Sequence, residues 1–204
     1  ESDDKGSRSI SAPQRPEGRI VTKDRNGNRK GSPRVRIVGM PDGNSQPIRV
    51  CVVGAESSGT TTLCRDLAEK FQTVWVPEYG RLYTEQLREQ GINTFSYEWK
   101  TEEFVHIAEQ QQLEEDRMST QANRVLICDT DALATAIWHL RYVGTWSPEV
   151  EAIANRRRYA MYFLTDPSIP FEQDGIRDGQ HIRPWMTKRF SEELTRRGLP
   201  WMLL

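Results

Sequence analysis

Residues 48 to 62 combine an apolar run with a glycine-bounded turn, and these residue types at this spacing commonly form a cradle for phosphate groups. Four residues separate Gly54 from Gly59, and three threonines follow. In such a loop the backbone N–H groups surround the phosphates, a lysine after the second glycine reaches the β and γ oxygens, and the next hydroxyl holds Mg²⁺. Thr61 provides that hydroxyl, whereas Thr60 occupies the lysine position. The motif therefore predicts a nucleotide site with an altered way of neutralising phosphate charge.

The whole loop is assigned to nucleotide binding, because its backbone amides and the start of the following helix face the same anion. The residues are Gly54, Ala55, Glu56, Ser57, Ser58, Gly59, Thr60, Thr61 and Thr62. The alternative is a plain strand-to-helix turn built from small residues.

An acidic residue follows the clearest second strand of the chain. Val125 to Cys128 is this strand, and Asp129 comes directly after it. A carboxylate at the end of a strand beside a phosphate loop is suited to hold the water shell of Mg²⁺. We therefore predict that Thr61 and Asp129 hold the metal, with a strand-end turn as the alternative role of Asp129.

Glu78 follows a shorter candidate strand, Val74 to Val76. Its carboxylate is suited to accept a hydrogen bond from an acceptor hydroxyl or to remove its proton. The alternative is an acid at a helix N-terminus, which the helix dipole favours. Asp131 competes with Glu78 for the role of base or ribose ligand, and the sequence does not rank the two. Tyr79 and Arg81 are further candidates to bind the acceptor.

The segment from Pro167 to Pro184 has the polarity and the glycine and proline content of a loop between a strand and a helix. We expect it to form a cationic lid. Arg177 is the first candidate to reach a transferring phosphate and Arg183 the second, because a guanidinium shares planar hydrogen bonds with phosphate oxygens. Asp174 is a further substrate-binding candidate. The alternative is a solvated ion pair of Arg177 with Asp174 or Asp178.

An alternation of strands and helices is needed to bring these residues together. Short β-branched runs separated by amphipathic stretches predict an α/β fold, a parallel sheet flanked by helices on both faces, as in P-loop NTPases. We expect Thr101 to cap one helix. Beyond the elements around the loop, the pattern predicts helices near 81–90, 101–119, 132–142, 149–158 and 187–197, and strands at 160–165 and 201–204.

Composition divides the 204 residues into two parts. Residues 1–46 lack aromatic side chains and are rich in glycine, proline, serine and basic residues, which predicts a mildly basic, mostly disordered arm. A short hairpin around Asn26-Gly27 is possible there. The formal net charge of −1 provides no global basic field, so we expect no nucleic-acid partner beyond weak contacts of the arm. Residues 47–204 form the folded domain, which we expect to continue past Leu204.

Cysteine usage and hydropathy indicate the compartment. The three cysteines lie in apolar runs without C-x-x-C spacing, which predicts buried free thiols and a reducing environment. No apolar run approaches the roughly 20 residues of a membrane span. We therefore expect a cytoplasmic protein that does not contact membranes.

Four motifs, taken together, resemble a known family. Gly54 to Leu63, Glu78 to Arg81, Asp129 to Asp131 and Asp174 to Arg177 are similar in order and spacing to the nicotinamide riboside kinase domain of the bifunctional NadR-type proteins of NAD salvage. The likeness covers residues 48–204. It implies a P-loop kinase-like domain that uses ATP and Mg²⁺ to phosphorylate the ribose 5′-hydroxyl of nicotinamide riboside. Tryptophans of the domain are then candidates to stack the nicotinamide ring, with core packing as the alternative.

Two departures from the family pattern bear on activity. Thr60 stands at the position where the family has the lysine of the phosphate loop. The H-x-G-H signature of the family's adenylyltransferase half does not occur in the chain. Three hypotheses follow: a nicotinamide riboside kinase in which another cation replaces the lysine, a nucleotide-binding regulatory module with weak or no transfer, and a kinase for another nucleoside. Retained carboxylates on the acceptor side favour an enzyme, because a binding module does not need them.

Overall fold

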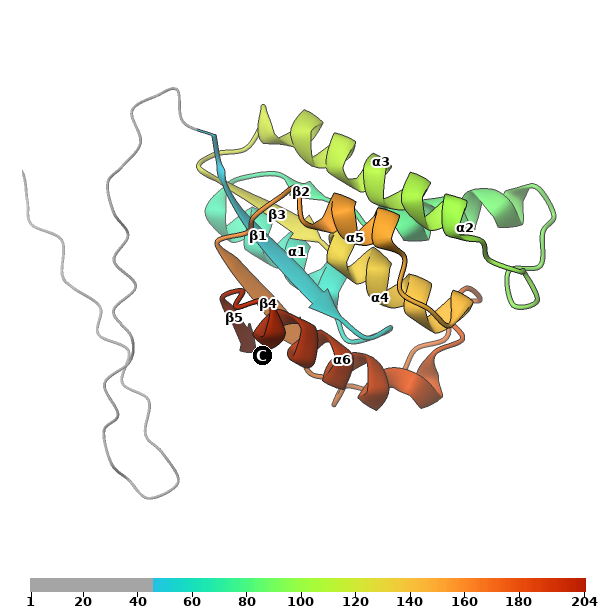
Figure 1. Ribbon diagram of the computed structural model, residues 1–204. Helices are drawn as coiled ribbons and strands as arrows, with labels where there is room; N and C mark the ends of the chain where they lie inside the picture. The colour runs from blue at the N-terminus through green and yellow to red at the C-terminus, as the bar shows by residue number, and fades with distance from the viewer. Residues whose placement is uncertain (1–45) are drawn as a thin grey trace, which may run out of the picture. The chain divides into compact units, whose positions relative to one another are not determined.

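The computed structural model describes residues 46–204, and the arm predicted for the N-terminal part, with its hairpin at Asn26-Gly27, lies outside the described residues (Figure 1). The described part is built around one sheet of five strands, in the order β2-β3-β1-β4-β5. All four strand pairings are parallel. The predicted parallel α/β fold is therefore confirmed.

The central strand of the sheet is the apolar run that precedes the phosphate loop. Valine and cysteine side chains of this strand are buried on both of its faces, which explains its continuous rather than alternating hydrophobic pattern. The strands are β1 (Ile48–Gly54), β2 (Trp75–Val76), β3 (Val125–Asp129), β4 (Met161–Thr165) and β5 (Trp201–Leu203).

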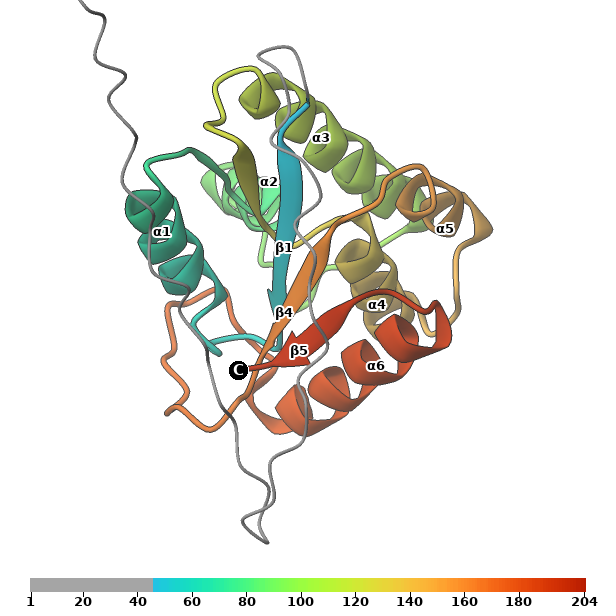
Figure 2. The same ribbon diagram turned by 90° about the vertical axis from the view of Figure 1, so that its left-hand side faces the viewer.

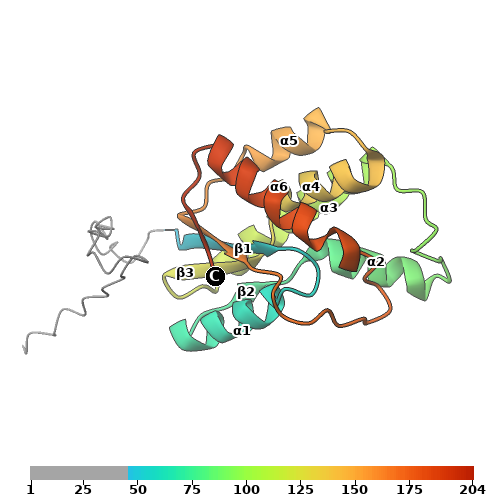
Figure 3. The ribbon, with the colours of Figure 1, turned by 90° about the horizontal axis from the view of Figure 1, so that it is seen from below.

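Helices cover both faces of the sheet, as Figures 2 and 3 show. On one face α1 packs Cys64 against Val52 and Ile127. On the other face α4 and α6 pack against the sheet, for example through Ile137 and Phe190, while α3 and α5 pack onto α4 and α2 packs onto α3. The helices are α1 (Thr60–Phe71), α2 (Tyr79–Glu89), α3 (Thr101–Ser119), α4 (Ala132–Val143), α5 (Pro148–Ala154) and α6 (Arg183–Arg196).

The helices α2, α5 and α6 differ from their predicted ranges, and α3 differs in its cap. The last helix, α6, begins at Arg183 because Pro184 fits the first turn of a helix, where no N–H partner is lost. Helix α5 ends at Ala154, since the following amides bond back to the carbonyls of its last turn. The prediction that Thr101 caps α3 is wrong: Lys100 is the cap residue, and its N–H donates to Glu103 Oε2 over 2.8 Å.

The register of the strands places three strand ends at one edge of the sheet. Val52 pairs with Asp129, and Gly54 pairs with Thr165. The loop after β1, the acidic end of β3 and the end of β4 therefore meet at the carboxyl edge, where parallel α/β proteins bind their ligands.

Two predictions about the whole chain concern cysteines and membranes. All three cysteines, Cys51, Cys64 and Cys128, are buried and unpaired, as predicted. Within residues 46–204, no helix has both the length and the apolar character that crossing a membrane requires.

Candidate active site

The loop between β1 and α1 turns sharply at glycine positions. A Cβ atom on Gly54 would lie 2.1 Å from Thr165 Oγ1 and 2.5 Å from Ser58 Oγ, so any other side chain would collide with the end of β4. Gly59 is the N-cap of α1 with φ of 85°, a conformation that favours glycine. The turn therefore brings the first amides of α1, with the positive end of the helix dipole, to the carboxyl edge of the sheet.

A hydroxyl and a carboxylate meet beside this loop. Thr61 Oγ1 donates to Asp129 Oδ2 over 2.5 Å. Asp129 is 1% exposed, and its Oδ1 has no hydrogen-bond partner within residues 46–204. Burial raises the pKa of Asp129, and hydrogen bonds from Thr61 and Thr60 oppose this rise. The predicted proximity of Thr61 and Asp129 is thus found.

These two residues fit Mg²⁺. Mg²⁺ commonly takes only one or two protein oxygens, and completes its shell with water and phosphate oxygens. The described residues contain no group of three or more His, Cys, Asp or Glu that could hold a metal, and such a group is not needed for this kind of site. The unpartnered Oδ1 of Asp129 is an oxygen that a cation and its water shell would satisfy.

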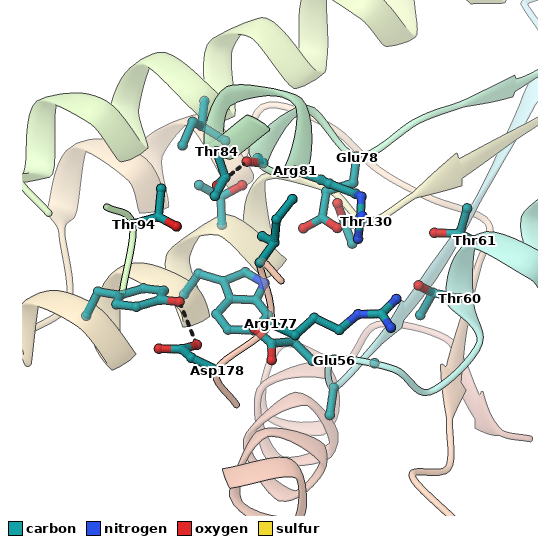
Figure 4. A pocket seen from close by; sticks show the side chains of 18 of the residues that line it. Glu56, Thr60, Thr61, Glu78, Arg81, Thr84, Thr94, Thr130, Arg177 and Asp178 are labelled. Atoms are coloured by element: carbon teal, nitrogen blue, oxygen red, sulfur yellow. Dashed lines mark hydrogen bonds between the residues drawn. The ribbon is translucent and has the colours of Figure 1, made fainter. Parts of the chain in front are cut away.

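A pocket extends from the phosphate loop to a group of aromatic side chains (Figure 4). Six of the nine predicted loop residues line it, whereas Ser58, Gly59 and Thr62 do not. The opposite end is formed by Trp99, Phe104, Trp138 and Tyr142. Their rings contact one another with centroids 5.5–6.3 Å apart. One elongated pocket therefore has a phosphate-binding end and an aromatic end.

Glu78 lies at the start of α2 and faces the pocket. Its carboxylate makes no hydrogen bond with any residue of 46–204, and Figure 4 shows it close to Thr130. Burial and the nearby Asp129 raise the pKa of Glu78 to about 8, although Arg81 acts in the opposite direction. A carboxyl group with this pKa exchanges its proton near neutral pH.

Two arginines provide the positive charge of the pocket lining. Arg81 Nη1 donates to Asp174 Oδ2 over 2.8 Å, and Arg177 Nε lies 3.3 Å from the same oxygen. Figure 4 shows the Arg177 guanidinium directed toward Thr60. Burial raises the pKa of Asp174, but the hydrogen bonds from Arg81 and the Ile176 amide, together with the charges of Arg177 and Arg81, outweigh burial and lower the pKa, which keeps the carboxylate charged.

This arrangement does not support the prediction that Asp174 binds substrate. Asp174 does not line the pocket, because its oxygens are used by Arg81, Arg177 and the backbone of its own loop. It positions the two arginines that do line the pocket. The predicted alternative, an ion pair between Arg177 and Asp174, is therefore also present.

The lid segment is bonded to the phosphate loop at several points. Glu172 N donates to Ser57 Oγ over 2.9 Å, and Gly179 N donates to Glu56 Oε2 over 2.7 Å. Arg183 Nη2 donates to the carbonyl of Ser57 over 3.1 Å. Arg183 is 7% exposed and does not line the pocket. This position does not support its predicted contact with a transferring phosphate, because the side chain donates to the carbonyls of Ser57 and Ile169 and holds the backbone of the loop in place.

Two further predicted residues point away from the pocket lining. Asp131 is 1% exposed; its Oδ1 accepts from Ala134 N over 2.9 Å and its Oδ2 from the Tyr162 hydroxyl over 2.8 Å. It caps α4 and does not line the pocket, a position that does not support its predicted role as base or ribose ligand. Tyr79 is also outside the lining, and its hydroxyl lies 3.4 Å from His106 Nε2.

The sequence interpretation missed residues that lie on helices rather than in motifs. Gln111 and Ile107 line the pocket from α3, and Tyr142 lines it from α4. Trp138 and Tyr142 are four residues apart on α4, a spacing that puts both on one face of a helix. That spacing is the sequence signal that could have identified Trp138 and Tyr142 as neighbours in one site.

The fold and the loop together define a P-loop NTPase, a nucleotide-binding protein with a parallel sheet between helices. The chain belongs to the AAA domain family, whose model matches residues 49–204.

Known proteins resemble the chain both in sequence and in structure. A trifunctional NAD biosynthesis/regulator protein, NadR of Salmonella typhimurium, is 30% identical over 128 residues, which are 63% of this chain and 30% of the relative. The chain thus spans less than a third of that relative's length. A NadR protein in complex with NR has a TM-score of 0.64 at 23% identity, over 78% of this chain and 45% of the other. A NadR protein with NAD and AMP-PNP has a TM-score of 0.62 at 19% identity, over 78% and 44%. The predicted resemblance to NadR-type proteins is confirmed.

Proposed function

We propose that residues 46–204 form a kinase domain that transfers the γ-phosphate of ATP to the 5′-hydroxyl of nicotinamide riboside. The observation that carries the proposal is the convergence of four groups on one pocket: the phosphate loop, Thr61 with the adjacent Asp129, Glu78, and the pair Arg81 and Arg177. A small-molecule kinase needs each of these parts. The similarity to NadR proteins, one of them in complex with NR and one with AMP-PNP, supports the choice of substrates.

The loop amides and α1 bind the phosphates of ATP in this proposal. Thr61 and Asp129 would hold Mg²⁺, which supplies positive charge to the phosphate oxygens. Arg177 and Arg81 provide the remaining charge on the lid side. The proposal thereby gives these arginines the task that a lysine performs at the position of Thr60.

Glu78 acts on the acceptor. The 5′-oxygen of the ribose attacks the γ-phosphorus, the bond from that phosphorus to the β,γ-bridging oxygen breaks, and ADP leaves. The hydroxyl proton passes to the Glu78 carboxylate. A pKa of about 8 makes the ionised Glu78 a better proton acceptor than an ordinary carboxylate, but below pH 8 most of the group is already protonated, so transfer should slow as the pH falls.

The aromatic end of the pocket suits the base of the nucleoside. Trp99, Trp138 and Tyr142 offer faces for stacking an aromatic ring. Trp99 Nε1 and Thr94 Oγ1 have no hydrogen-bond partner within the described part of the chain, so both are suited to bond a polar substituent such as a carboxamide. Other flat bases would also stack there, and a kinase for another nucleoside is the nearest alternative.

A nucleotide-binding regulatory module is the second candidate. Thr60 favours it, because loss of a positioned cation that stabilises transition-state charge typically lowers a rate by about 10²–10³. Such a module would bind ATP and transfer no phosphate.

One experiment separates the candidates. The full chain is incubated with ATP labelled at the γ-phosphate, Mg²⁺ and a panel of nucleosides that includes nicotinamide riboside, and the products are separated. We expect a labelled nucleotide from nicotinamide riboside above all others. Transfer to another nucleoside alone would reassign the substrate. Binding of ATP without transfer to any nucleoside would support the regulatory module, and failure to bind nucleotide at millimolar concentration would overturn both.

A further inference from the structure

Gln111 is a buried polar side chain whose hydrogen bonds are incomplete. It is 1% exposed and is one of the residues that line the pocket. Its Oε1 accepts from Tyr79 N over 2.8 Å. Its Nε2 has no partner within residues 46–204. A buried donor without a partner is unfavourable, and when it belongs to a binding pocket a ligand atom is a natural partner for it.

The orientation of this amide follows from the chemistry of its one partner. A backbone N–H can only donate, so the oxygen of Gln111 must face Tyr79. The NH₂ group is then the free end. The exchange of oxygen and nitrogen that often makes side-chain amides ambiguous would bring two donors together here, and is therefore excluded. Gln111 provides the pocket with a donor of fixed orientation.

The place of Gln111 along the pocket indicates what it would contact. Phe104, Ile107 and Gln111 all line the pocket from one face of α3. Gln111 comes seven positions after Phe104 on this helix, a distance of about 10 Å along the axis. Phe104 belongs to the aromatic end, whereas Gln111 bonds the residue directly after Glu78. Gln111 thus lies between the place for a base and the place for phosphate transfer, where the sugar of a nucleoside would extend.

We propose that Gln111 is a specificity-determining residue, which donates through Nε2 to a hydroxyl of the ribose and thereby favours ribonucleosides over deoxynucleosides. This inference rests on the proposed function, because it assumes that a nucleoside occupies the pocket. Glu78, when ionised, can only accept hydrogen bonds, and Gln111 adds a donor beside it. A site that bonds a substrate hydroxyl rejects an analogue without it, since its own polar group is then left unpaired.

A purely structural role for Gln111 predicts different behaviour. In that case the side chain only satisfies the first free N–H of α2, and its loss would weaken the binding of all nucleosides alike. Gln112 offers a matched control on the same helix. It is 7% exposed, its Nε2 donates to the carbonyl of Ile153 over 2.8 Å, and it does not line the pocket.

The test uses the full chain with nicotinamide riboside and its 2′-deoxy and 3′-deoxy analogues. For each ligand, KM and kcat are measured with Mg-ATP, and Kd is measured by calorimetry. We expect the unmodified protein to bind nicotinamide riboside at least about tenfold more tightly than one of the two analogues, as the loss of one hydrogen bond to a buried group implies. In Gln111→Met this preference should disappear, because the ribonucleoside loses the bond that the analogue never made. Gln112→Met should keep the preference, whatever its stability.

Several results would overturn the proposal. If the unmodified protein binds both analogues as well as nicotinamide riboside, Gln111 does not read a hydroxyl, and this result needs no variant. If Gln111→Met weakens the binding of all three ligands equally, the residue has only a structural role. If no ribonucleoside binds at millimolar concentration, the proposal is also wrong. Binding with the expected preference but without phosphorylation would contradict the proposed function alone, whereas phosphorylation without any change of preference in Gln111→Met would contradict this inference alone.

Discussion

Two glutamates, the half-buried Glu78 of the pocket and the buried Glu115 of α3, show how similar pKa values arise from different arrangements. Burial raises the pKa of Glu78 to about 8 and that of Glu115 to about 7. Glu115 accepts from the Tyr159 hydroxyl over 2.7 Å and lies 3.6 Å from Arg49 and 3.7 Å from Arg157. The Glu78 carboxylate makes no hydrogen bond within residues 46–204 and lines the pocket. A raised pKa alone therefore does not identify a functional carboxylate, whereas a raised pKa on a carboxylate that lines a pocket makes it a candidate.

Replacement of the two glutamates should separate their roles most strongly. Glu78→Gln keeps the size of the side chain but cannot accept a proton, so we expect phosphorylation of nicotinamide riboside to fall by about 10²–10⁴. ATP affinity should change little. Glu115→Gln should keep its activity per folded molecule and lose stability instead. Initial rates and nucleotide titrations on both variants check this, and equal loss of activity in both would remove the distinction.

The arginines beside each glutamate extend the comparison. We expect Arg177→Ala to lower the transfer rate by about 10²–10³, because a positioned cation stabilises charge in the transition state. Arg157→Ala should mainly lower the midpoint of thermal unfolding. If Arg177 takes the place of the lysine, the double variant with Arg177→Ala and Thr60→Lys should transfer phosphate at least about tenfold faster than Arg177→Ala alone. Failure of the lysine to recover any rate would mean that the loop is adapted to threonine.

Asp129 should affect metal and nucleotide together. Asp129→Asn removes the charge but keeps an oxygen near Thr61, so we expect Mg²⁺-dependent ATP affinity to fall by about 10–100-fold. The affinity for ATP measured without Mg²⁺, in the presence of EDTA, should change less. Calorimetric titration with and without Mg²⁺ provides both values. An equal loss in both conditions would indicate that Asp129 shapes the loop and does not act through the metal.

The smallest expected effect is on the pH dependence of stability. A carboxyl group whose pKa rises on folding, from 4.5 to about 8 for Glu78, binds more protons in the folded state than in the unfolded state at intermediate pH. The free energy of unfolding should therefore decrease as the pH rises through this range. Glu78→Gln should flatten the decrease up to about pH 8, and Glu115→Gln only up to about pH 7. Urea unfolding at a series of pH values measures both slopes, and identical slopes in the two variants would contradict the assigned pKa values.

The sequence predicted the fold and the phosphate end of the pocket well, because both depend on local patterns. The spacing of Gly54 and Gly59 and the position of Asp129 after a strand correctly indicated one carboxyl edge of the sheet. The roles of Asp131 and Arg183 could not be predicted in this way. Each follows from partners distant in the sequence, Tyr162 for Asp131 and the carbonyl of Ser57 for Arg183.

The aromatic end was difficult for a related reason. Aromatic side chains at helical spacing usually belong to a core, and only the approach of α3 to α4 turns Phe104 and Trp138 toward a shared pocket. Gln111 shares a helix face with Phe104 and Ile107 by its spacing, but it lies among other glutamines, and the sequence does not show that this face borders a pocket.

The close approach at Gly54 also has a consequence for how this sequence can vary during evolution. Since a Cβ there would lie 2.1 Å from Thr165 Oγ1 and 2.5 Å from Ser58 Oγ, a larger residue at 54 requires smaller residues at both other positions. Ser58 and Thr165 are also bonded to each other over 2.6 Å, so replacing only one of them removes one hydrogen bond of the other, buried hydroxyl. The three positions, of which Thr165 lies far from the other two in sequence, are therefore expected to be inherited as one unit.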